Sequence, residues 1–393
     1  MNLLMKTVIK GAKIILENKI LEDHVLVFTD KIESIMSNQQ WEGNVKNTEY
    51  EVIHHDGYVS PGFVDIHVHG AGGADTMDGS LEALRIISEK LITAGTTSYL
   101  ATTMTMDQVS IEAALDQVRE YMKIQSESNL TGSEVVGVHL EGPFISPEFK
   151  GAQSTEHIQK PTIDWIEKHL DIIKIITLAP EMDEAFKFIK SMKNRNVVLS
   201  MGHTGCDFET ACLAYDAGVD HVTHCFNAMT GLHHRKPGAV GATFAKPFTS
   251  ELITDGVHVH PGFYDTFIRI KSPEKVILVT DSMRASFLSE GTYDLGGQKV
   301  IVKDGAPRLK DGTIAGSVHK MDSALRNVIE HTGRPLEEII NMLSLNPAKR
   351  IGIDHIKGSI ETGKHADIVL LGDSLCVEKV FIKGYLKFSG GHS

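Results

Sequence analysis

The stretch Pro61-Gly62-Phe63-Val64-Asp65-Ile66-His67-Val68-His69-Gly70 ends an apolar run in two histidines separated by one residue. Successive side chains of a β-strand point to opposite faces, so this run predicts that His67 and His69 share one face at a strand end. Two imidazoles side by side suit a divalent transition metal. A strand with two ordinary hydrogen-bonded histidines would show the same pattern, so the metal interpretation depends on the rest of the chain.

Beyond Gly62, strand-like runs alternate with helical patterns. Residues 98–103 read as a strand and residues 108–125 as the helix after it, and residues 197–201 and 208–217 repeat this order. The alternation continues for eight β-then-α units over about 270 residues, which is the pattern and size of a (β/α)8 TIM barrel. The sequence therefore predicts an α/β protein built on such a barrel.

Four later apolar runs of the predicted barrel also end in a candidate metal ligand or proton carrier. These residues are Glu141, His203, His224 and Asp281. A polar residue that merely closes a strand is common at any one such position. Enzymes with this fold, however, place their catalytic residues at the carboxyl ends of the strands. Suitable residues at so many strand ends therefore predict one shared site.

Short strands are predicted at both ends of the chain. From about Thr7 to Ser37, and again after Asn346-Pro347, β-forming residues alternate with Gly, Asn and Asp. We expect the two ends to pair into one small β-sandwich beside the barrel. The expected division is residues 1–59 and 356–393 for the sandwich and residues 60–355 for the barrel.

The composition bounds the class of protein. The chain has 393 residues, 41% of them hydrophobic and 23% charged, which indicates a globular protein. A net charge of −12 argues against nucleic acid or an anionic membrane as the main partner, but allows a small anionic substrate. No apolar run reaches the length of a membrane span. Four cysteines without a paired framework are typical of a reducing cytoplasm, where we expect the protein to act.

The residues at the strand ends predict hydrolytic chemistry. Four histidines and Glu141 could hold one or two divalent ions, with the carboxylate able to bridge them. A metal-activated water is a nucleophile near neutral pH, and Asp281 could take its proton and pass it to a leaving amine. Amide or related C–N bond hydrolysis is therefore expected. The same ligands accept zinc, iron, manganese or cobalt.

Two loops could bind the substrate. The basic loop His233-His234-Arg235-Lys236-Pro237-Gly238 could clamp an anion, because Arg matches phosphate geometry, or it could simply be solvated. Residues 294–316 read as a β-hairpin or flap inserted after the last barrel strand, and a loop of that length is often functional. Asn227 is a possible hydrogen-bond partner of the substrate.

Several stretches together resemble the N-acetylglucosamine-6-phosphate deacetylase family of the amidohydrolase superfamily. Besides residues 61–70 they are His139-Leu140-Glu141-Gly142-Pro143-Phe144, Gly202-His203-Thr204, His224-Cys225-Phe226-Asn227-Ala228-Met229, Asp255-Gly256-Val257-His258, Val279-Thr280-Asp281 and Ala315-Gly316-Ser317. The resemblance implies hydrolysis of N-acetyl-D-glucosamine 6-phosphate to D-glucosamine 6-phosphate and acetate. It further implies a place in amino-sugar catabolism and cell-wall sugar recycling.

The resemblance also implies residue roles. Glu141, His203 and His224 would hold the main metal, and His67 and His69 a second ion shared with Glu141. Asp281 would be the general base and acid. Residues matching substrate contacts are Ala152, Gln153, Asn227, Ala228, His258 and Arg235, with Arg235 reaching across a homodimer interface. Gln153 departs from members that have His there, where the ring helps to hold the acetyl carbonyl.

Three alternatives remain open. The nearest is the galactosamine isomer of the same substrate, which differs in one hydroxyl group. Another amidohydrolase, acting on cyclic amides or aminoacyl groups, is disfavoured by Glu141 in place of a modified lysine and by the basic loop at Arg235. A non-catalytic scaffold is disfavoured because the full set of candidate ligands is present.

Overall fold

The computed structural model describes residues 5–44, 50–128 and 131–390, and its centre is an eight-stranded parallel sheet. The strand order is β17-β16-β15-β14-β13-β12-β11-β8. The strands are β8 (Phe63–Val68), β11 (Thr96–Thr102), β12 (Glu134–Glu141), β13 (Ile173–Leu178), β14 (Val198–Met201), β15 (Val219–Val222), β16 (Thr249–Ile253) and β17 (Val276–Val279).

The first and last strands of this sheet close it into a barrel. The amide of Asp281 donates to the carbonyl of His67 at 3.0 Å, and Val68 pairs with Ser282 in a parallel bridge. The prediction of a TIM barrel is therefore confirmed.

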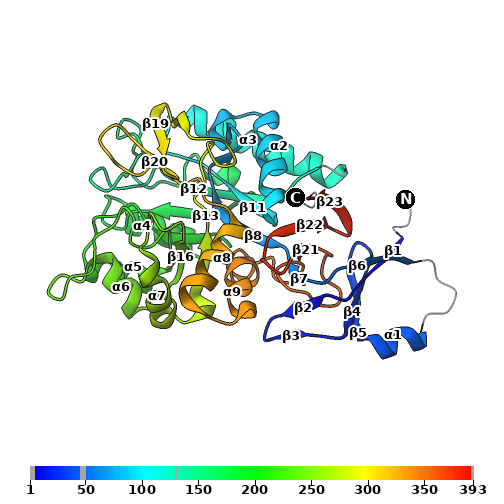
Figure 1. Ribbon diagram of the computed structural model, residues 1–393. Helices are drawn as coiled ribbons and strands as arrows, with labels where there is room; N and C mark the ends of the chain where they lie inside the picture. The colour runs from blue at the N-terminus through cyan, green and yellow to red at the C-terminus, as the bar shows by residue number, and fades with distance from the viewer. Residues whose placement is uncertain (1–4, 45–49, 129–130, 391–393) are drawn as a thin grey trace.

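Helices surround the barrel (Figure 1), because their apolar residues recur at helical spacing and face the strands. In α2, for example, Leu84, Ile87 and Leu91 are buried, Ser80 caps the first turn and Gly95 ends the segment with φ +83°. The α-helices are α2 (Leu81–Leu91), α3 (Gln108–Glu127), α4 (Ala185–Met192), α5 (Phe208–Ala217), α6 (Gly238–Ala245), α7 (Tyr264–Lys271), α8 (Met321–Thr332), α9 (Leu336–Leu343) and α10 (Leu345–Arg350). Short 3₁₀ turns are η1 (Thr76–Asp78), η2 (Ile92–Ala94), η3 (Glu167–His169), η4 (Pro261–Phe263) and η5 (Pro273–Lys275).

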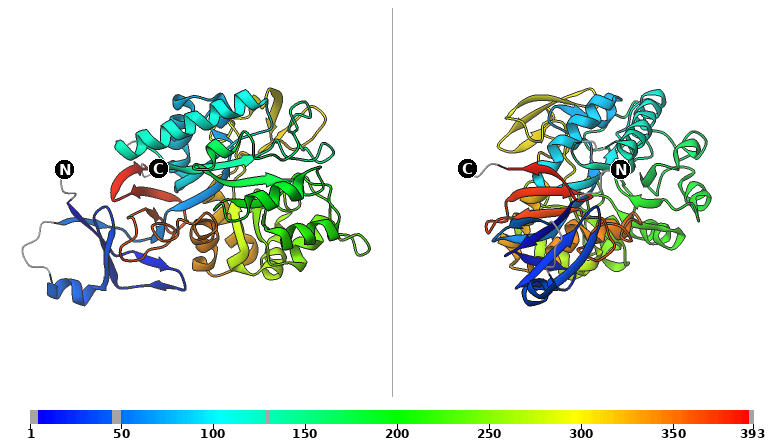
Figure 2. Two further views of the ribbon diagram at one scale, coloured as in Figure 1. Left: turned by 180° about the vertical axis from the view of Figure 1, so that it is seen from behind. Right: turned by 90° about the vertical axis from the view of Figure 1, so that its right-hand side faces the viewer.

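Both ends of the chain contribute to one six-stranded sheet, of order β23-β22-β21-β7-β2-β3. Its strands are β2 (Lys13–Leu16), β3 (Lys19–Leu21), β7 (Tyr58–Pro61), β21 (Ile368–Leu371), β22 (Val377–Ile382) and β23 (Tyr385–Ser389). In its centre β21 pairs antiparallel with β7, so that Leu370 lies opposite Val59. The strands from the N-terminal and C-terminal parts of the chain thus lie together at one side of the barrel (Figures 1 and 2).

A second, four-stranded sheet of order β5-β4-β1-β6 packs on the first. Its strands are β1 (Lys6–Lys10), β4 (His24–Phe28), β5 (Ile32–Ser37) and β6 (Tyr50–His54), and α1 (Asn38–Asn44) follows β5. Leu26 and Phe28 of this sheet share a buried core with Val59 and Ile368 of the other. The expected small β-sandwich is therefore present, while the domain bounds at residues 59/60 and 355/356 stay a prediction.

The flap after the last barrel strand is larger than the predicted hairpin. It begins at Gly291 and has three antiparallel strands, β18 (Gly291–Leu295), β19 (Gln298–Lys303) and β20 (Ala306–Arg308). Leu295 and Val300 pack with Met104 and Met283 above the barrel, and β20 pairs antiparallel with β19 as the third strand. A smaller ribbon of β9 (Gly70–Ala71) and β10 (Ala74–Asp75) follows β8. No helix in the described ranges is long and apolar enough to cross a membrane.

Candidate active site

The barrel brings the predicted ligands and the predicted proton carrier to one place. His67 lies near the end of β8, His69 directly after it, and Glu141 is the last residue of β12. The other three follow their strands at the same offset: His203, His224 and Asp281 each lie two residues after the last residue of β14, β15 or β17.

These three residues also share a strained backbone conformation. The φ angles of His203, His224 and Asp281 are +47°, +30° and +49°, in the left-handed region that non-glycine residues rarely occupy. Such conformations cost about 1–3 kcal/mol each, and they persist where the surrounding structure enforces them. The chain therefore uses one type of turn three times to direct a functional side chain inward over the barrel.

Glu141 lies at the centre of the histidines. Its Oε1 atom is 2.9 Å from Nε2 of His224, 3.2 Å from Nε2 of His203 and 3.4 Å from Nε2 of His67. Its Oε2 atom is 3.3 Å from Nε2 of His69. One carboxylate thus contacts all four rings, as a shared ligand would.

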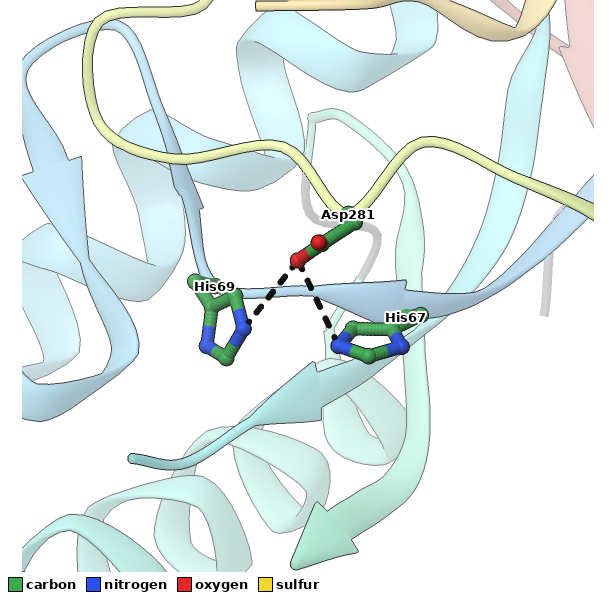
Figure 3. Close-up of side chains that lie close together, drawn as sticks. All are labelled: His67, His69 and Asp281. Atoms are coloured by element: carbon green, nitrogen blue, oxygen red, sulfur yellow. Dashed lines mark ion pairs between the residues drawn. The ribbon is translucent and has the colours of Figure 1, made fainter. Parts of the chain in front are cut away.

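Asp281 faces the two histidines of β8. Its Oδ1 atom is 3.4 Å from Nε2 of His67 and 3.3 Å from Nε2 of His69 (Figure 3). Burial raises the pKa of Asp281, but the positive charge on His67 and the hydrogen bond and charge of His69 outweigh burial. The net effect is a pKa below the usual value of an aspartate, so the carboxyl is ionised. An ionised, buried carboxylate at this place can accept a proton.

The charges around Glu141 favour a cation. Burial raises the pKa of Glu141, but the charges of His203 and His67 outweigh burial and hold it well below its usual range. Burial lowers the pKa of His69, whereas its hydrogen bonds and attraction to Asp281 and Glu141 raise it to about 9. Positive charge at this spot, whether an imidazolium or a metal ion, is therefore stabilised.

The arrangement of the side chains fits one or two divalent metal ions. Two buried groups have ligand atoms within 4.8 Å of one another: His67, His69 and Asp281, and Glu141, His203 and His224. The Nε2 atom of His67 is buried without a hydrogen-bond partner among the described residues, which suits a metal ligand. Imidazole nitrogens with carboxylate oxygens are a donor set for first-row transition metals.

A third group with metal-ligand spacing, His67, His139 and Glu251, is explained by hydrogen bonds. The Nδ1 atom of His139 lies 3.0 Å from the carbonyl of Ile66 and its Nε2 atom 2.7 Å from Oγ1 of Thr177. Because both ring nitrogens already have partners, this group is a buried network below the site.

A cavity of about 250 Å³ opens above the ligands and contains most of the predicted substrate contacts. His258 is fixed there by Asp255, whose Oδ2 atom lies 2.7 Å from Nδ1 of the ring. Burial lowers the pKa of His258, but the hydrogen bond and charge of Asp255 raise it above its usual value, which favours a cationic ring. The lining residues include His69, Glu141, Ala152, Gln153, His203, His224, Asn227, Ala228, His258 and Asp281.

Gln153 is directed at Glu141 as well as at the cavity. Its amide nitrogen donates to Oε2 of Glu141 at 2.8 Å, and its amide oxygen accepts from the backbone nitrogen of Thr105 at 2.8 Å. These two bonds fix the orientation of the Gln153 amide group beside the ligands.

Arg235 lies outside the cavity of its own chain. The residue is exposed in the loop before α6, and its guanidinium lies 2.7 Å from Nε2 of His234. Within one chain the structure therefore brings together every predicted site residue except Arg235.

Sequence reasoning missed several residues of the site. Met104, Leu295 and Ile314 line the cavity, and the flap supplies the last two. Glu251 is buried beneath the ligands in β16. A signal for Glu251 is present in the chain, because a lone glutamate between Ser250 and Leu252 stands out in a barrel strand.

Comparisons with known proteins identify the family of this chain. The amidohydrolase family matches residues 58–387. The N-acetylglucosamine-6-phosphate deacetylase of Bacillus subtilis (strain 168) is 40% identical over 386 residues, 97% of this chain and 96% of the relative. The N-acetylgalactosamine-6-phosphate deacetylase of Escherichia coli O157:H7 is 34% identical over 387 residues, 97% and 99% of the two chains.

A solved structure extends the likeness to the fold. The crystal structure of N-acetylglucosamine-6-phosphate deacetylase from Pasteurella multocida superposes with a TM-score of 0.91 at 29% identity, and the match covers 98% of this chain and 100% of that one. A family match over most of the chain and relatives above 30% identity over nearly its full length show the family. The chain belongs to the amidohydrolase family.

Proposed function

We propose that this protein hydrolyses N-acetyl-D-glucosamine 6-phosphate to D-glucosamine 6-phosphate and acetate, as a step of amino-sugar catabolism. The observation that carries the proposal is the convergence of four imidazoles on Glu141, beside Asp281, on the wall of a cavity of about 250 Å³. The relatives in Bacillus subtilis and Pasteurella multocida bear the name of this activity.

The residues that would hold metal are Glu141, His203 and His224 for one ion and His67, His69 and Glu141 for a second. A bound zinc, iron, manganese or cobalt ion supplies Lewis-acid polarisation of the amide carbonyl and lowers the pKa of a water molecule. The ring nitrogens of these histidines must be unprotonated to bind it, so metal binding releases protons from the site.

Asp281 moves the proton in this proposal. Its ionised carboxylate accepts a proton from the attacking water, whose oxygen forms the new bond to the acetyl carbon. The same proton then passes to the sugar nitrogen as the C–N bond breaks, which leaves acetic acid and the free amine. Asp281 is thereby returned to its ionised form. The acid then gives up the second proton of the water to the amine, so the final products are acetate and the ammonium form of the sugar, and atoms and charges balance over the cycle.

The remaining cavity residues would bind the sugar phosphate. The cationic ring of His258 suits the phosphate, and Asn227 with the backbone at Ala152 and Ala228 supplies hydrogen bonds. Gln153 would act through its fixed amide. Arg235, which is exposed and outside its own cavity, would reach the site of a second copy, so we propose a homodimer with isologous contacts. Four free cysteines support a cytoplasmic location.

A substrate panel tests the proposal and its nearest alternative. The relative in Escherichia coli O157:H7 bears the name of the galactosamine isomer, which differs in one hydroxyl group. Acetate release should be measured on both 6-phosphates and on unphosphorylated N-acetylglucosamine, with metal-loaded protein. The highest kcat/KM on the glucosamine isomer supports the proposal, a higher value on the galactosamine isomer supports the alternative, and no acetate from either phosphate contradicts both.

A further inference from the structure

Glu251 is a charged side chain in the barrel interior that the proposed mechanism does not use. It lies in the middle of β16, and none of its surface is exposed. A carboxylate taken out of water is costly unless hydrogen bonds or opposite charge compensate. Its partners therefore show what this glutamate is for.

Both oxygens of Glu251 contact groups that lead to the candidate ligands. The Oε2 atom lies 2.9 Å from Nδ1 of His67 and accepts from the backbone nitrogen of His224 at 3.0 Å. The Oε1 atom lies 3.3 Å from Nε2 of His221, whose Nδ1 atom is 2.7 Å from Oγ1 of Thr249. One carboxylate thus joins a ligand of each metal group from below.

The contact with His67 decides which ring nitrogen is available. When Nδ1 carries its proton toward Glu251, Nε2 is left as the nitrogen with a free lone pair. That Nε2 atom has no hydrogen-bond partner among the described residues and lies on the side of Glu141 and Asp281. A carboxylate behind a ligating histidine is the arrangement that raises ligand basicity and fixes ring orientation.

Of the four histidines, His67 alone has its Nδ1 atom hydrogen-bonded to a carboxylate in the described structure. The Nδ1 atom of His203 contacts the carbonyl of Phe149 at 3.0 Å. The Nδ1 atoms of His69 and His224 have no hydrogen-bond partner among the described residues. The support that Glu251 gives is therefore specific to the His67/His69 group, while its bond to His224 reaches only the backbone.

We propose that Glu251 is a positioning residue for metal binding by the His67/His69 group: it holds His67 in the tautomer that presents Nε2 and supplies negative charge beneath the ion. The inference rests on the metal site of the proposed function. Under this inference Glu251 decides whether one or two ions bind, since in the described structure its side chain forms no hydrogen bond to the side chains of Glu141, His203 or His224 and reaches only the backbone of His224.

The variant Glu251→Gln tests this role. Its amide oxygen can still accept from His67 and from the His224 backbone, and its amide nitrogen can donate to His221, so shape is kept and charge is lost. Loss of such a partner typically weakens metal binding 10–100-fold. We expect that loss for the His67/His69 group and a change within about threefold for the other group.

The experiment titrates metal-free protein with Mn²⁺ and follows free ion by electron paramagnetic resonance, which counts bound ions and their affinities. Glu134→Gln is the matched control, because Glu134 is a half-buried carboxylate at the opposite end of the barrel, paired with Lys357 and Lys383. Thermal unfolding of each metal-free variant reports folding separately. Glu251→Asp, which keeps the charge, should restore part of the affinity.

The outcomes separate this inference from the proposed function. Two ions in wild type and in Glu134→Gln, with the second weakened only in Glu251→Gln, support the proposal. Two ions of wild-type affinity in Glu251→Gln, or equal weakening of both ions, overturn it and leave the proposed function intact. A wild-type protein that binds no ion overturns the proposed function as well.

A measurement on wild-type protein keeps the proposal testable if Glu251→Gln does not fold. In zinc-loaded protein labelled with ¹⁵N-histidine, the His67 ring is assigned by the signals lost in His67→Asn. In the NMR spectrum, a proton on Nδ1 of His67 supports the proposal if its chemical shift is strongly downfield, as expected for a hydrogen bond to a carboxylate. A proton on Nε2 of His67 overturns it.

Discussion

The two ends of strand β12 carry glutamates in opposite surroundings, one half-buried and one buried. Glu134, at the amino end, pairs with Nζ of Lys357 at 2.6 Å and with Nζ of Lys383 at 2.5 Å. Glu141, at the carboxyl end, contacts four imidazoles, whose Nε2 atoms are 2.9–3.4 Å away. A glutamate at one end of the strand is therefore paired with lysine ammonium groups, and a glutamate at the other end contacts imidazole rings that can bind a metal instead.

The difference separates a structural ion cluster from a site. A lysine ammonium only donates hydrogen bonds and has no lone pair for a metal, so the partners of Glu134 cannot form a metal site with it. An imidazole can give up its proton and bind a metal instead, so the partners of Glu141 can change. We infer that Glu134 ties β12 to the C-terminal segment, whereas Glu141 works in chemistry.

The largest effect is expected from Glu141→Gln. The amide can donate as well as accept but carries no charge, so it should not hold an ion with His203 and His224. Loss of a proton carrier lowers turnover about 10²–10⁴-fold. We expect Glu141→Gln to lower turnover by more than that. Metal content by elemental analysis and acetate release are the measurements. If Glu141→Gln and Glu134→Gln lose turnover alike, the two ends of β12 do not differ as described.

The next effect in size concerns Asp281→Asn, which keeps the shape of the side chain but cannot accept the proton. We expect turnover to fall about 10²–10⁴-fold while bound metal stays at the wild-type level. Measuring both quantities on one preparation separates proton transfer from metal binding. Near-normal turnover of the asparagine variant would show that another group carries the proton.

A smaller effect is expected from Arg235→Ala, which removes a cation supplied from outside the cavity. Loss of a charged partner costs about 2–5 kcal/mol, which is at least tenfold in kcat/KM. The loss should be confined to phosphorylated substrate, and Arg85→Ala, at an exposed arginine of α2, is the control.

Mixed dimers of Arg235→Ala and Asp281→Asn chains test the subunit assignment of Arg235. Such a dimer has one intact composite site and should regain part of the activity that both parents lack. No recovery despite proven exchange of subunits would contradict a contribution from the second copy.

The smallest effect on turnover is expected from Glu134→Gln, which should act on stability. Breaking a fully buried ion pair costs about 3–5 kcal/mol, which is an upper bound here because Glu134 is half-buried, and unfolding by urea should occur at lower concentration. Burial raises the pKa of Glu134, but the charges and hydrogen bonds of Lys357 and Lys383 outweigh burial and lower the pKa to about 2. Its contribution is therefore complete above the unfolded-state pKa and is lost as the pH falls toward 2. Equal acid sensitivity of wild type and variant would contradict this assignment.

Local patterns account for the parts of the molecule that the sequence predicted. Five of the barrel strands, β8, β12, β14, β15 and β17, are apolar runs with a candidate site residue at or just after the end, so His203 and Asp281 could be placed without knowledge of the fold. The sandwich followed from strand-forming residues at both ends. The pairing of β21 with β7, by contrast, joins residues more than 300 positions apart in the printed sequence, and only the argument that both ends need a partner indicated it.

Residues that depend on distant neighbours could not be found in this way. Glu251 stands out as a lone glutamate in a barrel strand, but its partner His67 lies 184 positions away and could not be identified from the sequence. Leu295 of the flap packs in one buried cluster with Met104, a contact that a turn pattern does not reveal. The role of Arg235 requires a second chain, so neither one sequence nor one folded copy can decide it.

The central claim is that the carboxyl end of β12 is a metal-dependent deacetylase site, and one titration tests it directly. Metal-free protein is supplied with Zn²⁺, Mn²⁺, Fe²⁺ or Co²⁺ in steps, while bound ion and acetate release from N-acetyl-D-glucosamine 6-phosphate are measured together. The account predicts no turnover without metal, and turnover that rises with occupancy and levels off at one or two ions per chain. Full turnover in metal-free protein would contradict it.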